Sequence, residues 1–203
     1  MTRITTFASI ALCLLLASAP AQAARARQQL IEVDGIGVPA RGVTAELRLV
    51  RTESYTIILQ DILISSLTGQ PTTQPRTTPL GFSLPAGSKL FGSYAADADG
   101  IVYCALATEA GVRIVQLGDL TVPGPLAPVE LASFAAGDGF VPASTQMNII
   151  AILIGLLVEP RPAFSVTSST DGTSNTIMYA WSGSSFEKVV PVGDGTWVFD
   201  RPQ

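Results

Sequence analysis

The alternation of apolar and polar residues predicts β-strands along most of this chain. Residues 44–50 alternate strictly, with Ala45, Leu47 and Leu49 on one side and polar side chains between them. A period of two residues is typical of a strand with one buried face. Residues 55–64 are more continuously apolar and β-branched, which indicates a more central strand. Further strands are predicted at 82–84, 89–95, 101–107, 112–117, 164–167, 176–181, 186–192 and 196–199.

Two segments interrupt this pattern. Residues 69–81 contain three prolines among polar residues and predict a long surface loop, because proline cannot donate to a strand ladder. Residues 121–144 are rich in proline, glycine and alanine, which predicts a long crossover or a boundary. We therefore expect a single β-rich domain over residues 24–203, with a division near 121–144 as the alternative.

Residues 148–158 show no clear period. Ten consecutive residues, 149–158, are apolar or glycine, whereas a membrane-spanning helix needs roughly 20. Ser144 is placed to cap a helix here, but four isoleucines and Gly155 disfavour one. The β-branched residues favour a fully buried strand, and a helix is the alternative.

Two hairpins about 75 residues apart have similar sequences. Residues 101–105 (IVYCA) match 177–181 (IMYAW), and residues 112–119 (VRIVQLGD) match 187–194 (EKVVPVGD). In a true repeat, Tyr103 and Tyr179 would occupy equivalent positions; the alternative is that any two hairpins look alike.

A repeat of this kind indicates stacked or radially arranged β-meanders, since a lone hairpin cannot bury its apolar face. The predicted fold is therefore all-β, built of antiparallel meanders with propeller-like or sandwich packing. Two units cannot close a propeller, so the strands at 44–50 and 55–64 are expected to cover their free edges, and another copy of the protein is the alternative.

Residues 97–124 carry the clearest resemblance to a known group. They begin with an Asp-x-Asp-Gly turn and end in Gly-Asp-Leu-Thr-Val-Pro-Gly. This unit resembles secreted bacterial proteins of planctomycete type, which are built from propeller-like β-meander repeats. Residues 171–178 are similar to a segment of prepilin-like secreted proteins of such bacteria, although the prepilin N-terminus is missing. The two resemblances cover about a third of the chain and imply no catalytic residue.

The first 23 residues predict export. Arg3 precedes an almost uninterrupted apolar stretch at 7–17, and Ala21-Gln22-Ala23 is the small-x-small pattern that signal peptidase cleaves. We expect a signal peptide at 1–23, a mature protein that begins at Ala24, and a secreted or periplasmic location. No transmembrane segment is expected after cleavage.

Composition and charge exclude several classes of function. The net charge is −4 and no segment clusters Lys and Arg, so nucleic acid is not an expected partner. Histidine is absent, which excludes a Ser-His-Asp triad and an imidazole-rich metal site. Cys13 lies in the signal, so Cys104 remains alone, either as a buried apolar side chain, which its neighbours favour, or as a reactive or intermolecular thiol.

Few other residues suggest chemistry. Asp97 and Asp99 form a fragment of a calcium loop, but a hairpin turn is the favoured interpretation. Trp181 and Trp197 could form an aromatic platform for a sugar, although core packing is favoured for Trp181. The remaining candidates are serines in predicted turns with no visible base, namely Ser174, Ser184 and Ser185. No catalytic, cofactor-binding or metal-binding residue is assigned, and no cofactor is expected.

The sequence therefore favours an exported non-enzymatic protein, a binding or structural module of the envelope or extracellular space. A small secreted hydrolase that uses carboxylates on its loops is one alternative. An assembly subunit of a surface or secretion apparatus is another. A protein or a glycan is the kind of partner left open.

Overall fold

The computed structural model describes residues 28–38, 41–136, 142–170 and 173–201, and in these ranges the all-β prediction is confirmed. The strands of the first two sheets are β1 (Gln29–Val38), β2 (Val43–Arg51), β3 (Thr56–Ser65), β4 (Arg76–Ser83), β5 (Leu90–Ala96), β6 (Ile101–Thr108), β7 (Gly111–Asp119) and β8 (Val129–Ala135). Those of the third are β9 (Pro142–Ile154), β10 (Leu157–Thr170), β11 (Thr173–Trp181), β12 (Phe186–Gly193) and β13 (Thr196–Phe199). No helix within the described ranges is long and apolar enough to cross a membrane.

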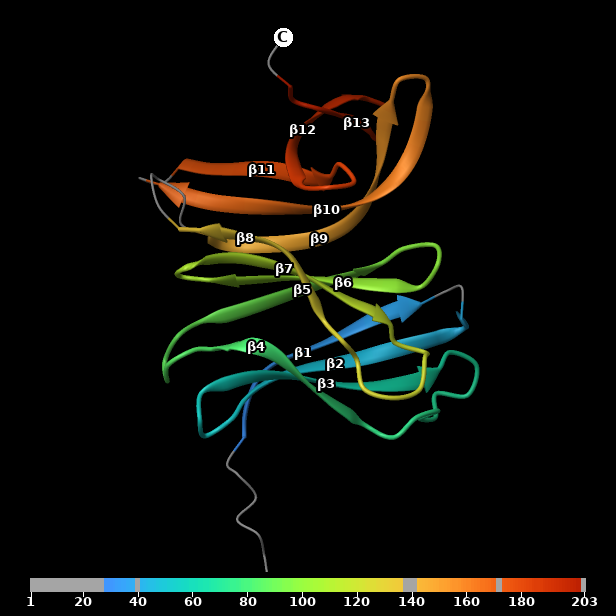
Figure 1. Ribbon diagram of the computed structural model, residues 1–203, viewed down its shortest axis with the longest axis vertical. Coiled ribbons are helices and arrows are strands. Elements are labelled where there is room, and N and C mark those ends of the chain that lie inside the picture. The colour runs from blue at the N-terminus through green and yellow to red at the C-terminus, as the bar shows by residue number, and fades with distance from the viewer. Residues whose placement is uncertain (1–27, 39–40, 137–141, 171–172, 202–203) are drawn as a thin grey trace, which may run out of the picture.

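The strands form three successive meanders. The first sheet has the order β1-β2-β3-β4 and the second the order β5-β6-β7-β8, each with antiparallel neighbours. The third sheet closes on itself, because β13 pairs with β12 on one side and, in parallel, with β9 on the other. Figure 1 shows the three sheets stacked as layers, with the second sheet in the middle. The predicted antiparallel meanders are confirmed.

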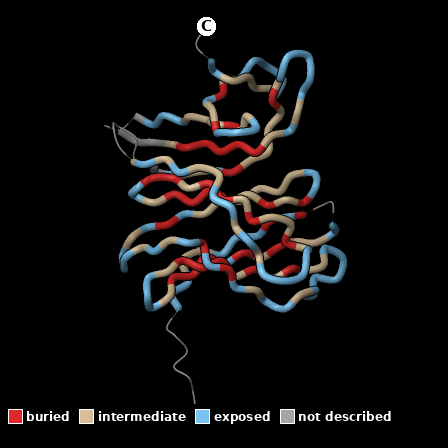
Figure 2. The backbone as a smooth tube through the Cα atoms, viewed as in Figure 1, coloured by how far each residue is buried: buried red, intermediate tan, exposed pale blue. Residues whose placement is uncertain are grey.

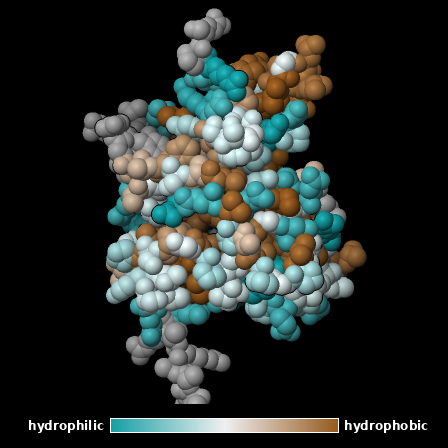
Figure 3. All heavy atoms as spheres, viewed as in Figure 1, coloured by the Kyte–Doolittle hydropathy of each residue, from teal (hydrophilic) through white to brown (hydrophobic). Residues whose placement is uncertain are grey.

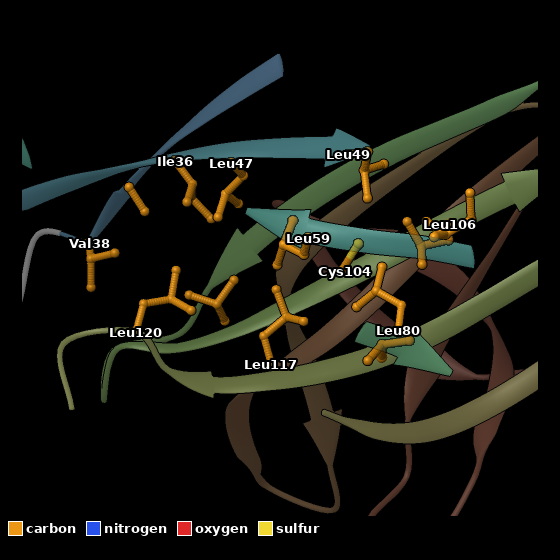
Figure 4. Close-up of a cluster of buried hydrophobic side chains, with 14 of the residues drawn as sticks. Ile36, Val38, Leu47, Leu49, Leu59, Leu80, Cys104, Leu106, Leu117 and Leu120 are labelled. Atoms are coloured by element: carbon orange, nitrogen blue, oxygen red, sulfur yellow. The ribbon is translucent and has the colours of Figure 1, made fainter. Parts of the chain in front are cut away.

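The strict alternation at residues 44–50 places one face of β2 in the first core. Ala45, Leu47 and Leu49 are fully buried there, between the first and second sheets. Figure 4 shows these leucines from the first sheet meeting Leu106 and Leu117 from the second. Burial of large aliphatic side chains stabilises a fold by about 1.5–3 kcal/mol each, so this layer holds the first two sheets together.

A second core joins the middle sheet to the third. Phe164 of β10 is fully buried, and its ring lies 5.2 Å from that of Tyr179, nearly parallel to it. Phe134 of β8 lies 5.2 Å from the Phe164 ring, so the aromatic cluster spans both sheets. Figure 2 shows stretches of buried residues on both sides of this interface. Apolar packing thus connects the parts of the chain before and after residues 121–144.

Among the described residues, the third core is formed by side chains of the closed sheet alone. Ile152, Ala163, Ala180 and Val189 come from four of its strands and are buried. Trp197 and Phe199 of β13 pack against them. The short strand β13 therefore contributes to the third core when it closes the sheet.

A buried ion pair joins two strands of the first sheet, and its arginine also bonds to the segment that follows the second sheet's β7. Asp61 of β3 is 1% exposed, and its Oδ2 accepts hydrogen bonds from Arg76 Nη2 at 2.6 Å and Nε at 3.0 Å. The same guanidinium donates to the carbonyl oxygens of Leu120 at 2.6 Å and Val122 at 2.8 Å. Arg76 thus links β3 and β4 to the connection that follows β7.

Two predicted loops contain strands. The prediction of a loop over residues 69–81 is wrong from Arg76 onward, where β4 begins. Pro79 is accommodated because β4 lies at the edge of its sheet, where a missing N–H breaks no inner ladder. Likewise, residues 121–144 contain β8 and the start of β9.

Residues 148–158 form neither a helix nor one buried strand. They include the end of β9, a two-residue turn at Gly155 and Leu156, and the start of β10. Gly155 has φ +63°, which suits the first central position of a type II′ hairpin turn. Strand structure is confirmed up to Ile154, but full burial is wrong, because the turn projects into solvent.

The two hairpins proposed as a repeat both form, but their registers differ. Tyr103 lies opposite Gln116, whereas Tyr179 lies opposite Lys188. The sequence alignment requires Tyr179 to face Pro191, so the equivalence of the two tyrosines is wrong. The cause is the position of the turn: the last pair before it, Thr108 with Gly111, comes five residues after Tyr103, whereas Trp181 with Phe186 comes two residues after Tyr179.

The N-terminal strands do not cover hairpin edges as expected. β2 and β3 are the inner strands of a complete sheet with β1 and β4. This sheet packs its apolar face on the face of the second sheet. The reason is that strands with alternating apolar residues form a sheet with one apolar face. Such a face is buried by packing on the face of another sheet, and the edge of a hairpin is too narrow to cover it.

Candidate functional site

The aspartates of the calcium-like fragment shape a turn. Asp97 Oδ1 accepts hydrogen bonds from the backbone N–H of Asp99 at 3.0 Å and of Ile101 at 2.9 Å. Its Oδ2 accepts one from the Tyr103 hydroxyl at 3.2 Å. The predicted turn is confirmed. Across the described ranges, no three His, Cys, Asp or Glu side chains gather where they could hold a metal ion.

The two tryptophans pack against different cores. Trp181 lies in the second core with its ring 5.2 Å from that of Phe186. Trp197 packs against the third core. Core packing of Trp181 is confirmed, and the two rings do not share one platform for a sugar.

Cys104 is buried in the first core, as expected. Burial raises the pKa of its thiol far above the ordinary value, and the neighbouring Tyr94 hydroxyl has a raised pKa for the same reason. Desolvation likewise raises the pKa of Glu32, which accepts a hydrogen bond from the Gly92 N–H. A thiol kept protonated is a poor nucleophile, so Cys104 functions here as an apolar side chain.

The serines offer no activated hydroxyl. Ser184 and Ser185 lie in the turn between β11 and β12, where the Ser185 carbonyl accepts a hydrogen bond from Ser182 Oγ at 2.9 Å. Ser174 was expected in a turn but lies within β11. Ser174 belongs to this strand because its backbone pairs with that of Ser169 in β10.

Cavities border the first two sheets, and three of them are lined by residues of the described ranges. One of about 250 Å³ includes Phe82 and Phe134, and the Arg113 guanidinium lies 4.9 Å from the Phe82 ring centre. A second of about 240 Å³ includes Glu130, whose carboxylate pairs with Arg113 at 3.0 Å. The third, of about 260 Å³, has no acidic residue. Because carboxylate-dependent hydrolysis needs two facing carboxyl groups, none of the three favours it.

The most unusual surface is the end of the β9–β10 hairpin, residues 154–158, which we call the hairpin tip. Leu156 is 99% exposed, Leu157 66%, Val158 56% and Ile154 38%. Figure 3 shows a brown, hydrophobic projection at the corner where Figure 1 places this hairpin. Single exposed apolar side chains are ordinary, whereas large contiguous apolar patches are typical of protein–protein or membrane interaction sites.

Charge is excluded from the hairpin tip. No charged residue occurs at positions 149–158, and the nearest along β10 are Glu159 and Arg161, which form an ion pair with each other. The stem below is rigid, because Ile152 and Phe164 are fully buried in the third and second cores. The hairpin tip is therefore an uncharged apolar projection whose strands are anchored in two cores, an arrangement that suits insertion into an apolar cleft.

The sequence contained a signal for this site. Gly-Leu between two apolar strands is a possible two-residue hairpin turn, with glycine at the first position. This turn was not predicted because residues 149–158 are all apolar or glycine, and continuous apolar segments are usually buried.

No protein-family model matches the chain, and no similar protein was found among curated proteins. The fold and the site thus define an all-β protein of three stacked sheets with a projecting apolar hairpin.

Proposed function

We propose that this chain is an exported, non-enzymatic binding protein of the envelope or extracellular space, and that its hairpin tip inserts into a cleft on a partner protein. The exposure of four apolar side chains within residues 154–158 carries the proposal. The signal-like N-terminus supports export.

A protein fits the tip better than the other partners do. Glycan recognition relies on aromatic faces and polar groups, and residues 154–158 contain neither. An anionic membrane attracts clustered Lys and Arg, which are absent from 149–158. A cleft on a protein can enclose the projecting leucines and exclude water from them.

Photocrosslinking tests which partner the tip contacts. A photoreactive residue is placed at position 156 and, as a control, at position 67, because Leu67 is 96% exposed in another part of the molecule. We expect position 156 to give one predominant protein adduct that position 67 does not give. Adducts with phospholipid only, with another copy of this chain only, or equally at both positions would contradict the proposal.

The identified partner then permits a quantitative test. Burial of a leucine stabilises a complex by about 1.5–3 kcal/mol, so Leu156→Ser should weaken binding by about tenfold or more. Leu67→Ser should leave the affinity unchanged, and both variants should keep the melting temperature of the parent protein. Equal affinities for the two variants would refute the role of the tip.

Export is tested separately by intact mass. When the full chain is expressed in a bacterial host, the exported protein is expected to begin at Ala24, because Ala21 and Ala23 supply the small residues before the cleavage site. A measured mass that retains residues 1–23 would contradict this part of the proposal.

A further inference from the structure

The cavity of about 260 Å³ is positively charged although the protein is acidic. It lies between β1 and β2 of the first sheet and β5 of the second. Two cationic side chains, Arg51 and Lys89, line it together with no acidic residue. The whole chain has net charge −4, so the charge of the cavity lining is opposite to the net charge of the protein. A local concentration of cations attracts anions.

Hydrogen bonds to neutral groups hold the Arg51 guanidinium in place. It is 4% exposed, its Nη2 donates to the Ser88 carbonyl at 2.7 Å, and its Nη1 donates to Gln29 Oε1 at 3.3 Å. Its Nε is buried without a hydrogen-bond partner, and the ion pairs of the described residues include none with Arg51. A buried cation without an anion is costly, so a bound anion would stabilise this site.

Apolar side chains border the same cavity. Leu30 and Phe91 line it and are about half exposed, at 55% and 46%. They come from β1 and β5, the edge strands of the two sheets. The cavity therefore combines a cationic wall with apolar surface that is still open to contact.

We propose that this cavity binds a small organic anion, an oxyanion joined to a short apolar group. Arg51 and Lys89 neutralise the oxyanion, since guanidinium and ammonium groups donate charge-assisted hydrogen bonds to its oxygens. Leu30 and Phe91 contact the apolar group. A neutral ligand of the same shape gains only the second interaction and binds more weakly.

Thermal unfolding at low ionic strength tests the proposal with phenyl phosphate, benzoate, inorganic phosphate and phenol. At ten times its dissociation constant, phenyl phosphate or benzoate should raise the melting temperature by about 3–5 °C. The better of the two identifies the oxyanion. Inorganic phosphate should bind less tightly than phenyl phosphate, and phenol should give no shift.

Substitution at Lys89 locates the site. Lys89→Gln should weaken binding of the better probe at least fivefold, because it removes one of the two cations. The matched control is Lys188→Gln, which alters the other lysine of the chain, in an ion pair with Asp200 outside the cavity. Phe91→Ser should weaken phenyl phosphate more than inorganic phosphate. Arg51→Met would remove the other cation, but Arg51 is buried and its replacement can prevent folding. Lys89 and Phe91 are exposed, so their variants test the site even in that case.

The proposal fails if no anion stabilises the protein, or if phenol stabilises it as well as the anions do. It also fails if Lys89→Gln and Lys188→Gln lose affinity equally. Because the cavity and the hairpin tip lie on different sheets, neither result bears on the partner that the tip binds.

Discussion

Replacing Arg76 with leucine is expected to destabilise the protein by about 3–5 kcal/mol, the usual cost of leaving a buried charge unpaired. The variant leaves the carboxylate of Asp61 buried without its cation and removes the bonds from Arg76 to the carbonyls of Leu120 and Val122. Urea unfolding, followed by circular dichroism, measures the loss as a fall in the free energy of unfolding.

Arg48→Leu is the matched control. Arg48 also pairs with a carboxylate, that of Glu46, but its side chain is half exposed. Exposed pairs contribute about 0–1 kcal/mol, so this variant should unfold close to the parent. The double variant Asp61→Leu/Arg76→Leu should regain much of the stability, because it removes both buried charges. If Arg76→Leu and Arg48→Leu lower the free energy of unfolding equally, the buried contacts of Arg76 stabilise the protein no more than an exposed ion pair does.

Truncating Phe164 to alanine should cost about 3–5 kcal/mol, as for other large-to-small changes in a packed core. Phe164 is fully buried and contacts the rings of Tyr179, Phe134 and Phe186, so the change removes the centre of the second core. The expected result is a lower free energy of unfolding and weaker near-ultraviolet circular dichroism, which reports packed aromatic side chains.

Phe91→Ala provides the comparison for this core. Its ring is about half exposed, so its truncation should change stability by about 0.5 kcal/mol or less. A Phe164→Ala variant that is as stable as Phe91→Ala would show that the second and third sheets are not held together by the aromatic cluster.

Local pattern predicted most strands of this protein, but it missed β1, β8 and the first half of β4, and it did not predict the surfaces. The alternation around Leu47 predicted both a strand and its buried face, because side-chain direction follows directly from the period of two. The edge position of β4 was not predictable, since it depends on how strands assemble across the sheet. Pro79 was therefore assigned to a loop.

The same limitation applies to the candidate sites. Leu156 and Ile152 have similar sequence surroundings, yet one is fully exposed and the other is fully buried. The difference arises because β13 covers β9 only as far as the pairing of Trp197 with Ile152, and this contact is remote in sequence. The cavity around Arg51 likewise combines residues from β1, β2 and β5, which no local motif connects.

The parallel pairing of β13 with β9 has a consequence for the order of folding. Neighbouring strands of the first two sheets are consecutive in the chain, so these sheets can form as soon as their residues have been synthesised. The third sheet cannot close until Thr196 reaches Ala151, a contact of long sequence separation, and such contacts form slowly. Until then one edge of β9 is unpaired beside an isoleucine-rich run, which makes the last step of folding the one most exposed to aggregation.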